Sequence, residues 1–180
     1  AAVLVLQQPY GGWKPSTSQP WTSQQKGEDV DALFFDPDAD GDQDLYIARG
    51  GNEATEGSAQ LQDLLYLNNG QGRFKLASNW LPAAPYSSGR VQAADYDQDG
   101  DIDLFVSGRQ RPGQYPLPGH SQLLRNDGNG FTDVTETLAP GLAEVGMVTD
   151  ARWLDADGDS RLDLALVGEW MPLTIAYQRD

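Results

Sequence analysis

The chain has 180 residues, a formal net charge of −15 and no cysteine, and its length suits one domain with a sizeable core. A chain this acidic repels phosphate backbones and anionic lipid headgroups, so no nucleic-acid partner and no membrane insertion are expected, whereas multivalent cations suit it. The lack of cysteine excludes disulfides, thiolate metal sites and a cysteine nucleophile. No apolar run approaches the roughly 20 residues of a membrane span. The apolar segment Ala1–Leu6 is predicted to be a strand, and any export signal is expected upstream of it.

Short apolar runs flank three aspartate-rich segments along the chain. These segments align without gaps and begin at residues 36, 95 and 155, so the repeat is 59 or 60 residues long. The flanking runs are, in chain order, Ala32–Phe35 and Leu45–Ala48, Val91–Ala94 and Leu104–Ser107, and Ala151–Leu154 and Leu164–Val167. Near-continuous apolar runs of this length predict strands buried on both faces, so each aspartate loop is expected to join two antiparallel strands.

A second hairpin is predicted after the first two aspartate loops. Leu64–Phe74 and Leu123–Phe131 place Asn-Gly or Asp-Gly steps between apolar residues, and such turns need the positive φ that these residues adopt. Val3–Trp13 has the same shape, and Leu173–Asp180 matches its first half. Each repeat is therefore expected to form a four-stranded antiparallel unit, and the predicted fold class is all-β.

The expected division of the chain follows these units. Residues 1–28 end a preceding unit and connect it to the next, residues 29–89 and 90–147 form two complete units, and residues 148–180 form an incomplete one. The polar, Gly- and Pro-rich segments Arg49–Asp63 and Gly108–Ser121 are predicted to be long loops, and no helix is expected.

The aspartate loops carry the chemistry. Each has carboxylates at positions 1, 3, 5 and 9, which repel one another unless a cation lies between them, and hard oxygen ligands at this density favour Ca²⁺ over Mg²⁺ or Zn²⁺. Position 7 is expected to offer its backbone carbonyl, so its side chain is free to vary. The residues predicted for three Ca²⁺ sites are Asp36, Asp38, Asp40, Asp42 and Asp44; Asp95, Asp97, Asp99, Asp101 and Asp103; and Asp155, Asp157, Asp159, Arg161 and Asp163.

An EF-hand shares the first six positions of these loops. It also requires a bidentate Glu at position 12 and flanking helices. Position 12 is Ile47, Val106 or Leu166, each inside a predicted strand, so EF-hand and dockerin-type loops are excluded.

Position 6 of each loop is expected to need a positive φ, because the chain must turn sharply there. Gly41 and Gly100 meet this requirement, whereas Ser160 stands at the same position of the third loop. The third site is therefore predicted to be strained or weaker.

These loops resemble the FG-GAP (also called VCBS) repeat, the Asp-x-Asp-x-Asp-Gly-x-x-Asp-Leu blade unit of integrin α-subunit propellers. The whole chain looks most similar to bacterial secreted FG-GAP proteins with ASPIC/UnbV-type domains, through the hairpin at Leu65–Asn68 and the stretch Val167–Pro172. The resemblance implies a seven-bladed β-propeller with Ca²⁺ between strands 1 and 2 of a blade, of which this chain supplies about three blades. The first two loops match the motif fully, and the third matches except at Ser160.

No enzymatic activity is predicted. His120 is the single histidine and is expected to be structural or solvated beside Pro118 and Gly119, and no serine has a base partner for a catalytic triad. The loop carboxylates could mimic a glycosidase acid–base pair, but they recur in every unit, which metal ligation explains and catalysis does not.

Aromatic residues outside the loops suggest core or contact positions. Four tryptophans in or beside predicted strands are expected in the core: Trp13, Trp80, Trp153 and Trp170. Trp21 lies in a Ser/Thr/Gln-rich segment and is either buried or an exposed stacking platform for a sugar. Arg109–His120 mixes Arg, Tyr and Pro and is the segment most suited to contact a partner, with a merely solvated loop as the alternative.

The expected function is that of a Ca²⁺-binding propeller scaffold, at the cell surface or outside the cell, that binds a protein or a glycan. Two alternatives stay open: an accessory, lectin-like domain of a carbohydrate-active enzyme, and a structural subunit that assembles into an extracellular filament. Propellers close with about four to eight blades, so neighbouring blades or subunits are expected at both chain ends. Val3–Leu6 has no charge to deter strand pairing and is expected at such a contact.

Overall fold

The computed structural model describes residues 3–16, 19–23 and 26–179. The strands are β1 (Val5–Gln7), β2 (Trp13–Pro15), β3 (Glu28–Phe35), β4 (Asp44–Gly50), β5 (Leu64–Leu67), β6 (Lys75–Leu76), β7 (Ser88–Ala94), β8 (Asp103–Gly108), β9 (Gln122–Asn126), β10 (Phe131–Asp133), β11 (Met147–Leu154), β12 (Asp163–Glu169) and β13 (Thr174–Ala176). The helical segments are η1 (Pro20–Ser23), η2 (Ala59–Leu61), α1 (Thr135–Leu138) and η3 (Pro140–Leu142).

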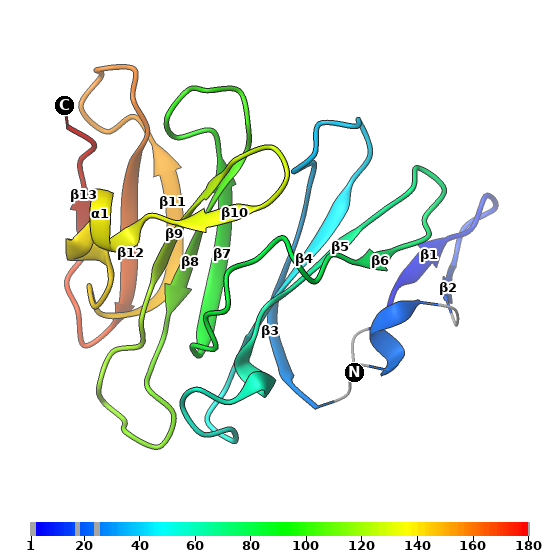
Figure 1. Cartoon of the computed structure of the whole chain (residues 1–180), viewed down its shortest axis with the longest axis horizontal. Coiled ribbons are helices and arrows are strands. Elements are labelled where there is room, and N and C mark those ends of the chain that lie inside the picture. Colours follow the sequence, from blue (N-terminus) through cyan, green and yellow to red (C-terminus); the bar gives the residue numbers. More distant parts are fainter. Residues whose placement is uncertain (1–2, 17–18, 24–25, 180) are drawn as a thin grey trace.

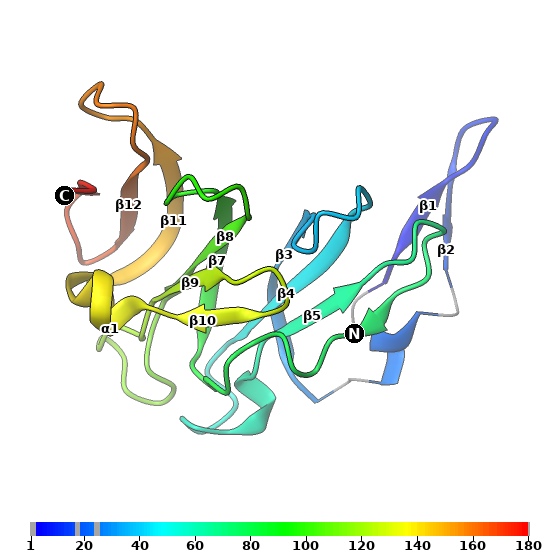
Figure 2. The ribbon, with the colours of Figure 1, turned by 45° about the horizontal axis from the view of Figure 1, so that its top comes forward.

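The strands form antiparallel sheets that follow one another along the chain. Two four-stranded sheets, β3-β4-β5-β6 (the first sheet) and β7-β8-β9-β10 (the second sheet), follow the pair β1-β2. They are followed by the three-stranded sheet β11-β12-β13 (the third sheet). The sheets stand next to one another in chain order (Figure 1), and the turned view shows them as successive blades (Figure 2). The predicted all-β class and the four-stranded unit are confirmed, whereas ring closure and the number of blades stay predictions.

The aspartate loops connect the strands that the apolar runs predicted: β3 to β4, β7 to β8 and β11 to β12. Each of these pairs is antiparallel and has a register shift near its other end, between Asp29 and Asp31, between Ser88 and Val91, and between Val148 and Asp150. The sequence repeat is therefore also visible in the backbone, since β3, β7 and β11 each have a register shift at a similar place.

The strands β4 and β8 are buried on both faces, as the apolar runs predicted, whereas β12 is partly exposed, with Val167 at 43%. In β4, Leu45 and Ile47 pack with Trp21 on one side of the first sheet, whereas Tyr46 and Ala48 pack toward the second sheet. Because neighbouring strand residues point to opposite faces, one strand contributes to two cores.

The strand β8 repeats this arrangement. Leu104 and Val106 pack against the first sheet, and Phe105 packs with Val148 and Leu166 of the third sheet. Phe105 is fully buried, and its replacement by alanine would cost about 3 to 5 kcal/mol. The sheets are thus joined by continuous apolar layers rather than by loops alone.

A buried carboxylate also ties the first two sheets together. Asp63 accepts hydrogen bonds from the Tyr46 hydroxyl (2.6 Å), the Arg49 backbone N–H (2.6 Å) and the Ser88 hydroxyl (2.8 Å). Burial raises the pKa of Asp63 to about 7 although these donors act in the opposite direction. Sequence analysis placed Asp63 only at the end of a loop and did not identify this network.

A ladder of ion pairs connects β3, β7 and β11, the first strands of the three sheets. Arg90 of β7 pairs with Asp31 of β3 at 3.2 Å and with Asp150 of β11 at 3.3 Å. Asp31 also accepts the backbone N–H of Val91 at 2.9 Å. The three charged residues occupy the same position of the repeat, five residues before the first aspartate of each loop, so acid, base and acid alternate from sheet to sheet.

The core prediction holds for two of the four tryptophans for which it was made. Trp80 and Trp153 are partly buried and pack against the apolar clusters, as expected. The core prediction is wrong for Trp13 and Trp170, whose exposed fractions are 68% and 84%. The sugar-platform alternative for Trp21 is also wrong, because this side chain is 4% exposed and its ring lies 5.4 Å from that of Tyr66.

Two further expectations concern helices and the N-terminal strand. The expectation of no helix misses α1, a single turn that ends in the exposed Leu138. At the N-terminal end, Leu4 packs against the apolar cluster of the first sheet, whereas Val5 and Leu6 of β1 are exposed. Within the described residues, none of the helices has the length and apolarity needed to cross a membrane.

Candidate metal centres

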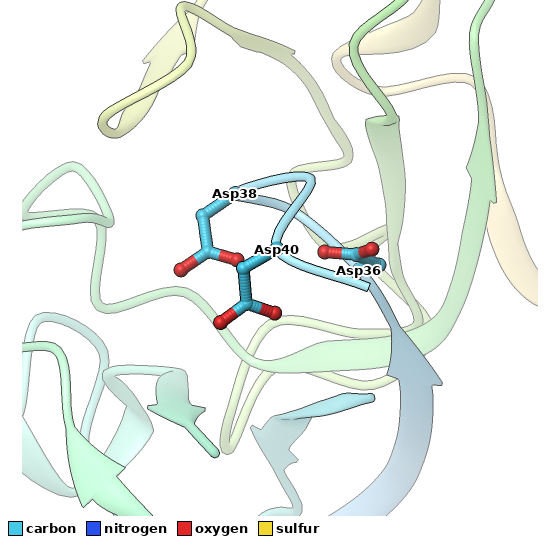
Figure 3. Close-up of side chains that lie close together, drawn as sticks. All are labelled: Asp36, Asp38 and Asp40. Atoms are coloured by element: carbon cyan, nitrogen blue, oxygen red, sulfur yellow. The ribbon is translucent and has the colours of Figure 1, made fainter. Parts of the chain in front are cut away.

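The aspartate loops bring together the carboxylates that the repeat predicted. In the first loop, Asp36, Asp38 and Asp40 each offer an oxygen, and these oxygens lie within 4.8 Å of one another. Figure 3 shows all three side chains on the turn that leaves β3, with Asp38 and Asp40 beside each other. The groups at the other two loops meet the same distance criterion and consist of Asp95, Asp97 and Asp99, and of Asp155, Asp157 and Asp163.

Backbone hydrogen bonds hold each loop in the same shape. The position-6 N–H donates to the position-1 carboxylate in all three loops, from Gly41 to Asp36 (2.9 Å), from Gly100 to Asp95 (3.1 Å) and from Ser160 to Asp155 (2.9 Å). The position-7 N–H donates to the position-5 carboxylate, from Asp42 to Asp40 (3.0 Å), from Asp101 to Asp99 (2.9 Å) and from Arg161 to Asp159 (2.9 Å). The carboxylates therefore fold the turn as well as gathering charge.

Position 6 has a positive φ in every loop, as predicted. The angle is 89° at Gly41, 99° at Gly100 and 69° at Ser160, so the serine adopts a conformation that favours glycine. Position 4 is a second left-handed position, which sequence analysis missed: φ is 55° at Ala39 and 83° at Gly158. Each loop thus has glycine at one of its two left-handed positions and another residue at the second, Gln98 serving at position 4 of the second loop with φ 63°.

The position-9 aspartates are buried and connect each loop to the neighbouring hairpin. Asp44 accepts the backbone N–H of Asn68 at 2.6 Å, and Asp103 accepts that of Asn126 at 2.8 Å. Asp163 does the same with Gln178 at 2.9 Å. These buried carboxylates belong to the first residues of β4, β8 and β12, so they fix the base of each loop.

Several carboxylate oxygens are shielded from water and lack a hydrogen-bond donor. In the first loop these are the Oδ1 atoms of Asp36, Asp38 and Asp42 and the Oδ2 atom of Asp44, and in the second loop the Oδ1 atom of Asp95. Buried polar atoms normally have partners. Oxygens held this way beside further carboxylates fit the ligand set of a hard cation such as Ca²⁺.

The electrostatics agree with this fit. Burial raises the pKa of Asp44 and of Asp103 to about 7, and the nearby carboxylates of Asp38 and Asp97 act in the same direction. Burial, followed by the adjacent Asp40 or Asp99, also raises the pKa of Asp38 and Asp97. A divalent cation among these groups would favour their ionised forms and remove the mutual repulsion.

The third loop differs because arginines reach its carboxylates. Arg161 pairs with Asp159 at 2.7 Å, and Arg179 pairs with Asp157 at 2.6 Å. The backbone and side-chain hydrogen bonds from Arg161 lower the pKa of Asp159. Two fixed positive charges therefore compete with a cation at this site, which adds to the strain expected at Ser160.

Some predicted site residues are not among the clustered carboxylates: Asp42, Asp44, Asp101, Asp103, Asp159 and Arg161. Of these, Asp42 and Asp101 occupy position 7 of their loops. Their Oδ2 atoms lie 3.5 and 3.6 Å from the position that a Cβ would take on Gly70 and Gly128, the turn glycines of the adjacent hairpins. This placement is compatible with position 7 contributing a carbonyl rather than a carboxylate.

Sequence analysis missed the asparagine that couples neighbouring loops. Besides capping Asp103, Asn126 donates from Nδ2 to the Pro37 carbonyl at 2.7 Å, which joins the second sheet to the first aspartate loop. Gln98 of the second loop donates to the Ser160 carbonyl of the third at 2.9 Å. The aligned Asn68 and Asn126 in the repeated hairpins were the available signal.

The comparisons with known proteins agree with the repeat. A family model described as an FG-GAP-like repeat matches residues 36–106, from the first aspartate loop into β8. This match supports the FG-GAP resemblance for that segment. Searches of curated proteins and of solved structures gave no significant match.

Proposed function

We propose that this chain is a Ca²⁺-stabilised, propeller-type binding scaffold of the FG-GAP kind. The observation that carries the proposal is the set of three aspartate loops with clustered carboxylates, which in the first two loops include buried oxygens without donors. The FG-GAP-like repeat over residues 36–106 supports the same function. The cations are structural in this proposal: in each of the three sheets, one cation holds the loop that joins the first strand to the second.

The expected contribution of the metal is large. A ligand present at about 100 times its dissociation constant stabilises the folded state by about 2.7 kcal/mol per site. Three such sites would approach the total stability of a typical domain, about 5 to 15 kcal/mol. The hydrogen bonds between loops add to this effect, because loosening one loop removes a partner from its neighbour.

The proposal places the protein outside the cell or at its surface, with a protein or a glycan as its partner and with neighbouring blades or subunits at its ends. It also places the chain near bacterial secreted FG-GAP proteins with ASPIC/UnbV-type domains, on the Val167–Pro172 stretch. We propose no catalytic role, because metal ligation accounts for the repeated carboxylates. The ring of His120 lies against that of Tyr86, tilted by 33° with the centroids 4.3 Å apart, which agrees with a structural role for this histidine.

Self-assembly is a second candidate role, favoured by the exposed apolar side chains on β1. Val5 and Leu6 are exposed on a strand of a two-stranded sheet, and such an edge can recruit another strand. Light scattering of the purified chain tests this role: a particle several times the mass of one chain would support a filament or ring, and a stable monomer would exclude it.

The calcium proposal is tested by thermal unfolding of the same protein in Ca²⁺, in Mg²⁺ and in excess chelator. We expect Ca²⁺ to raise the melting temperature strongly, and Mg²⁺ to do so less because it prefers to keep its waters. Isothermal titration should give a stoichiometry approaching three. An unchanged melting temperature after chelation would show that the loops hold no stabilising cation.

A further inference from the structure

The loops opposite the aspartate turns form a second surface, which the calcium proposal does not use. The aspartate loops precede β4, β8 and β12. The loops of this second surface follow the same three strands and therefore lie at the opposite end of the sheets (Figure 1). They comprise residues 51–63, 109–121 and 170–173. The middle loop is the Arg109–His120 segment singled out by its composition.

This loop surface is held in place without any metal ligand. The Gly113 N–H donates to Asn52 Oδ1 at 2.6 Å, which joins the middle loop to the first. Arg109 forms an ion pair with Glu169 beside the third loop. The middle loop is therefore anchored on both sides, and a surface ordered in advance loses less entropy when a ligand binds.

Trp170 is the unusual residue of this surface. It is 84% exposed and its φ is 56°, a left-handed conformation that is an outlier for a bulky side chain. Its Nε1–H donates to the Tyr115 hydroxyl at 2.7 Å, so its one polar group is satisfied while most of the side chain is open to solvent. Strained backbone that displays a large side chain to solvent is typical of functional positions.

The two loops that carry Tyr115 and Trp170 expose charged side chains as well as apolar ones, since Leu117 and Leu173 are 46% and 67% exposed. Tyr115 is 55% exposed. Arg109 and Arg111 precede it in the middle loop and form ion pairs with Glu169, the residue before Trp170, and with Glu144. A groove of about 490 Å³ lined by Arg109, Asn52 and Glu53, among others, adjoins this surface. Acidic and basic side chains that can form hydrogen bonds thus belong to the same loops as the exposed indole.

We propose that Trp170 and Tyr115 form a binding site for a neutral saccharide chain, a proposal that rests on the scaffold function above. The face of an aromatic ring is negatively polarised, and the C–H bonds of one face of a pyranose ring are positively polarised, so the two stack. The hydroxyls of the sugar would bond to the Arg109–Glu169 pair. The net charge of −15 disfavours uronates and sulfated glycans.

A protein partner is the competing occupant of this surface. Protein interfaces place their tryptophan anchors in packed, desolvated pockets with an apolar centre. Here the indole is 84% exposed and the residue before it, Glu169, is ion-paired with Arg109, which suits a ligand that both stacks and forms hydrogen bonds. The saccharide is therefore the occupant that these observations favour.

The test uses the full chain in Ca²⁺, titrated calorimetrically with neutral hexasaccharides of glucose, mannose, xylose and N-acetylglucosamine, and with a hexauronate. We expect at least one neutral probe to bind and the uronate not to bind. Trp170→Ala should weaken binding at least about tenfold, as for other single stacking rings, and Trp170→Phe should weaken it less. Trp13→Ala is the matched control, because Trp13 is also exposed but belongs to β2, and it should bind as the unmodified chain does.

Absence of binding to every neutral probe, or equal losses in Trp13→Ala and Trp170→Ala, would overturn the proposal. Should Trp170→Ala fold poorly, Tyr115→Phe removes only the hydroxyl that orients the indole, and unchanged affinity in that variant would count against the site. The outcome is separable from the calcium test. A chain that melts lower in chelator but binds no saccharide keeps the scaffold function and loses the glycan site.

Discussion

Replacing Ser160 by glycine should stabilise the protein. Ser160 has a φ of 69° at the position where the first two loops have glycine. Its backbone N–H donates to Asp155 at 2.9 Å and its carbonyl accepts from Gln98 at 2.9 Å, and both contacts survive the substitution. The change therefore removes left-handed strain while it leaves the backbone hydrogen bonds of the loop in place.

The size of the effect follows from two opposing contributions. Left-handed backbone costs a non-glycine residue about 1 to 2 kcal/mol, whereas glycine makes the unfolded chain more flexible and so loses about 0.4 to 1 kcal/mol. The middle values of these ranges, about 1.5 and about 0.7 kcal/mol, give a net gain of about 0.8 kcal/mol. For a chain of this length, that raises the melting temperature by about 1 to 4 °C.

Circular dichroism melts of the unmodified chain and of Ser160→Gly measure this, both in Ca²⁺ and in chelator. Because the strain belongs to the backbone, the gain should appear in both conditions. The control is Ala156→Gly in the same loop, whose φ lies outside the left-handed region and which should lose about 0.5 to 1 kcal/mol. An unchanged or lower melting temperature for Ser160→Gly would refute the strain argument.

Three other predictions concern the loops and the buried carboxylate. Asp97→Ala should remove one calcium from the stoichiometry whereas Asp101→Ala should keep it, because Asp101 is expected to offer only its carbonyl; equal losses in titration would contradict this. Arg179→Gln should tighten the third site several-fold by removing the cation 2.6 Å from Asp157, and an unchanged affinity would exclude competition. The pKa of Asp63 is raised from 3.8 to about 7, so its contribution to stability is present below pH 3.8 and is lost as the pH rises through 7. Denaturant titrations of Asp63→Asn should show less of this loss, and parallel pH profiles would disprove it.

The repeat made most of the fold predictable. The aligned aspartates and the apolar residues beside them located the strand pairs β3–β4, β7–β8 and β11–β12. They also predicted the positive φ at position 6, because tight turns and alternating burial depend on local residues. The same alignment failed at Trp13 and Trp170. Their neighbours in sequence lie on strands, but burial depends on whether another sheet covers that strand, and this cannot be read from local pattern.

Contacts between sheets were likewise beyond local pattern. Asp63 meets Ser88 across 25 residues, and Asn126 reaches the Pro37 carbonyl across 89. Each of these side chains occupies an ordinary turn or strand-end position in its own repeat. Only the stacking of one sheet on the next brings them together, so a single repeat contains no signal for them.

The ladder of Asp31, Arg90 and Asp150 limits how the repeats can be recombined. A duplicated or transposed first repeat, placed directly against the third, would set Asp31 against Asp150 and leave two partly buried acids without a base. Arg90 is ion-paired with both neighbours at once, so the second repeat belongs between two repeats that carry an acid at this position. The repeats are therefore not freely interchangeable: the sign of the charge at this position must alternate from one sheet to the next.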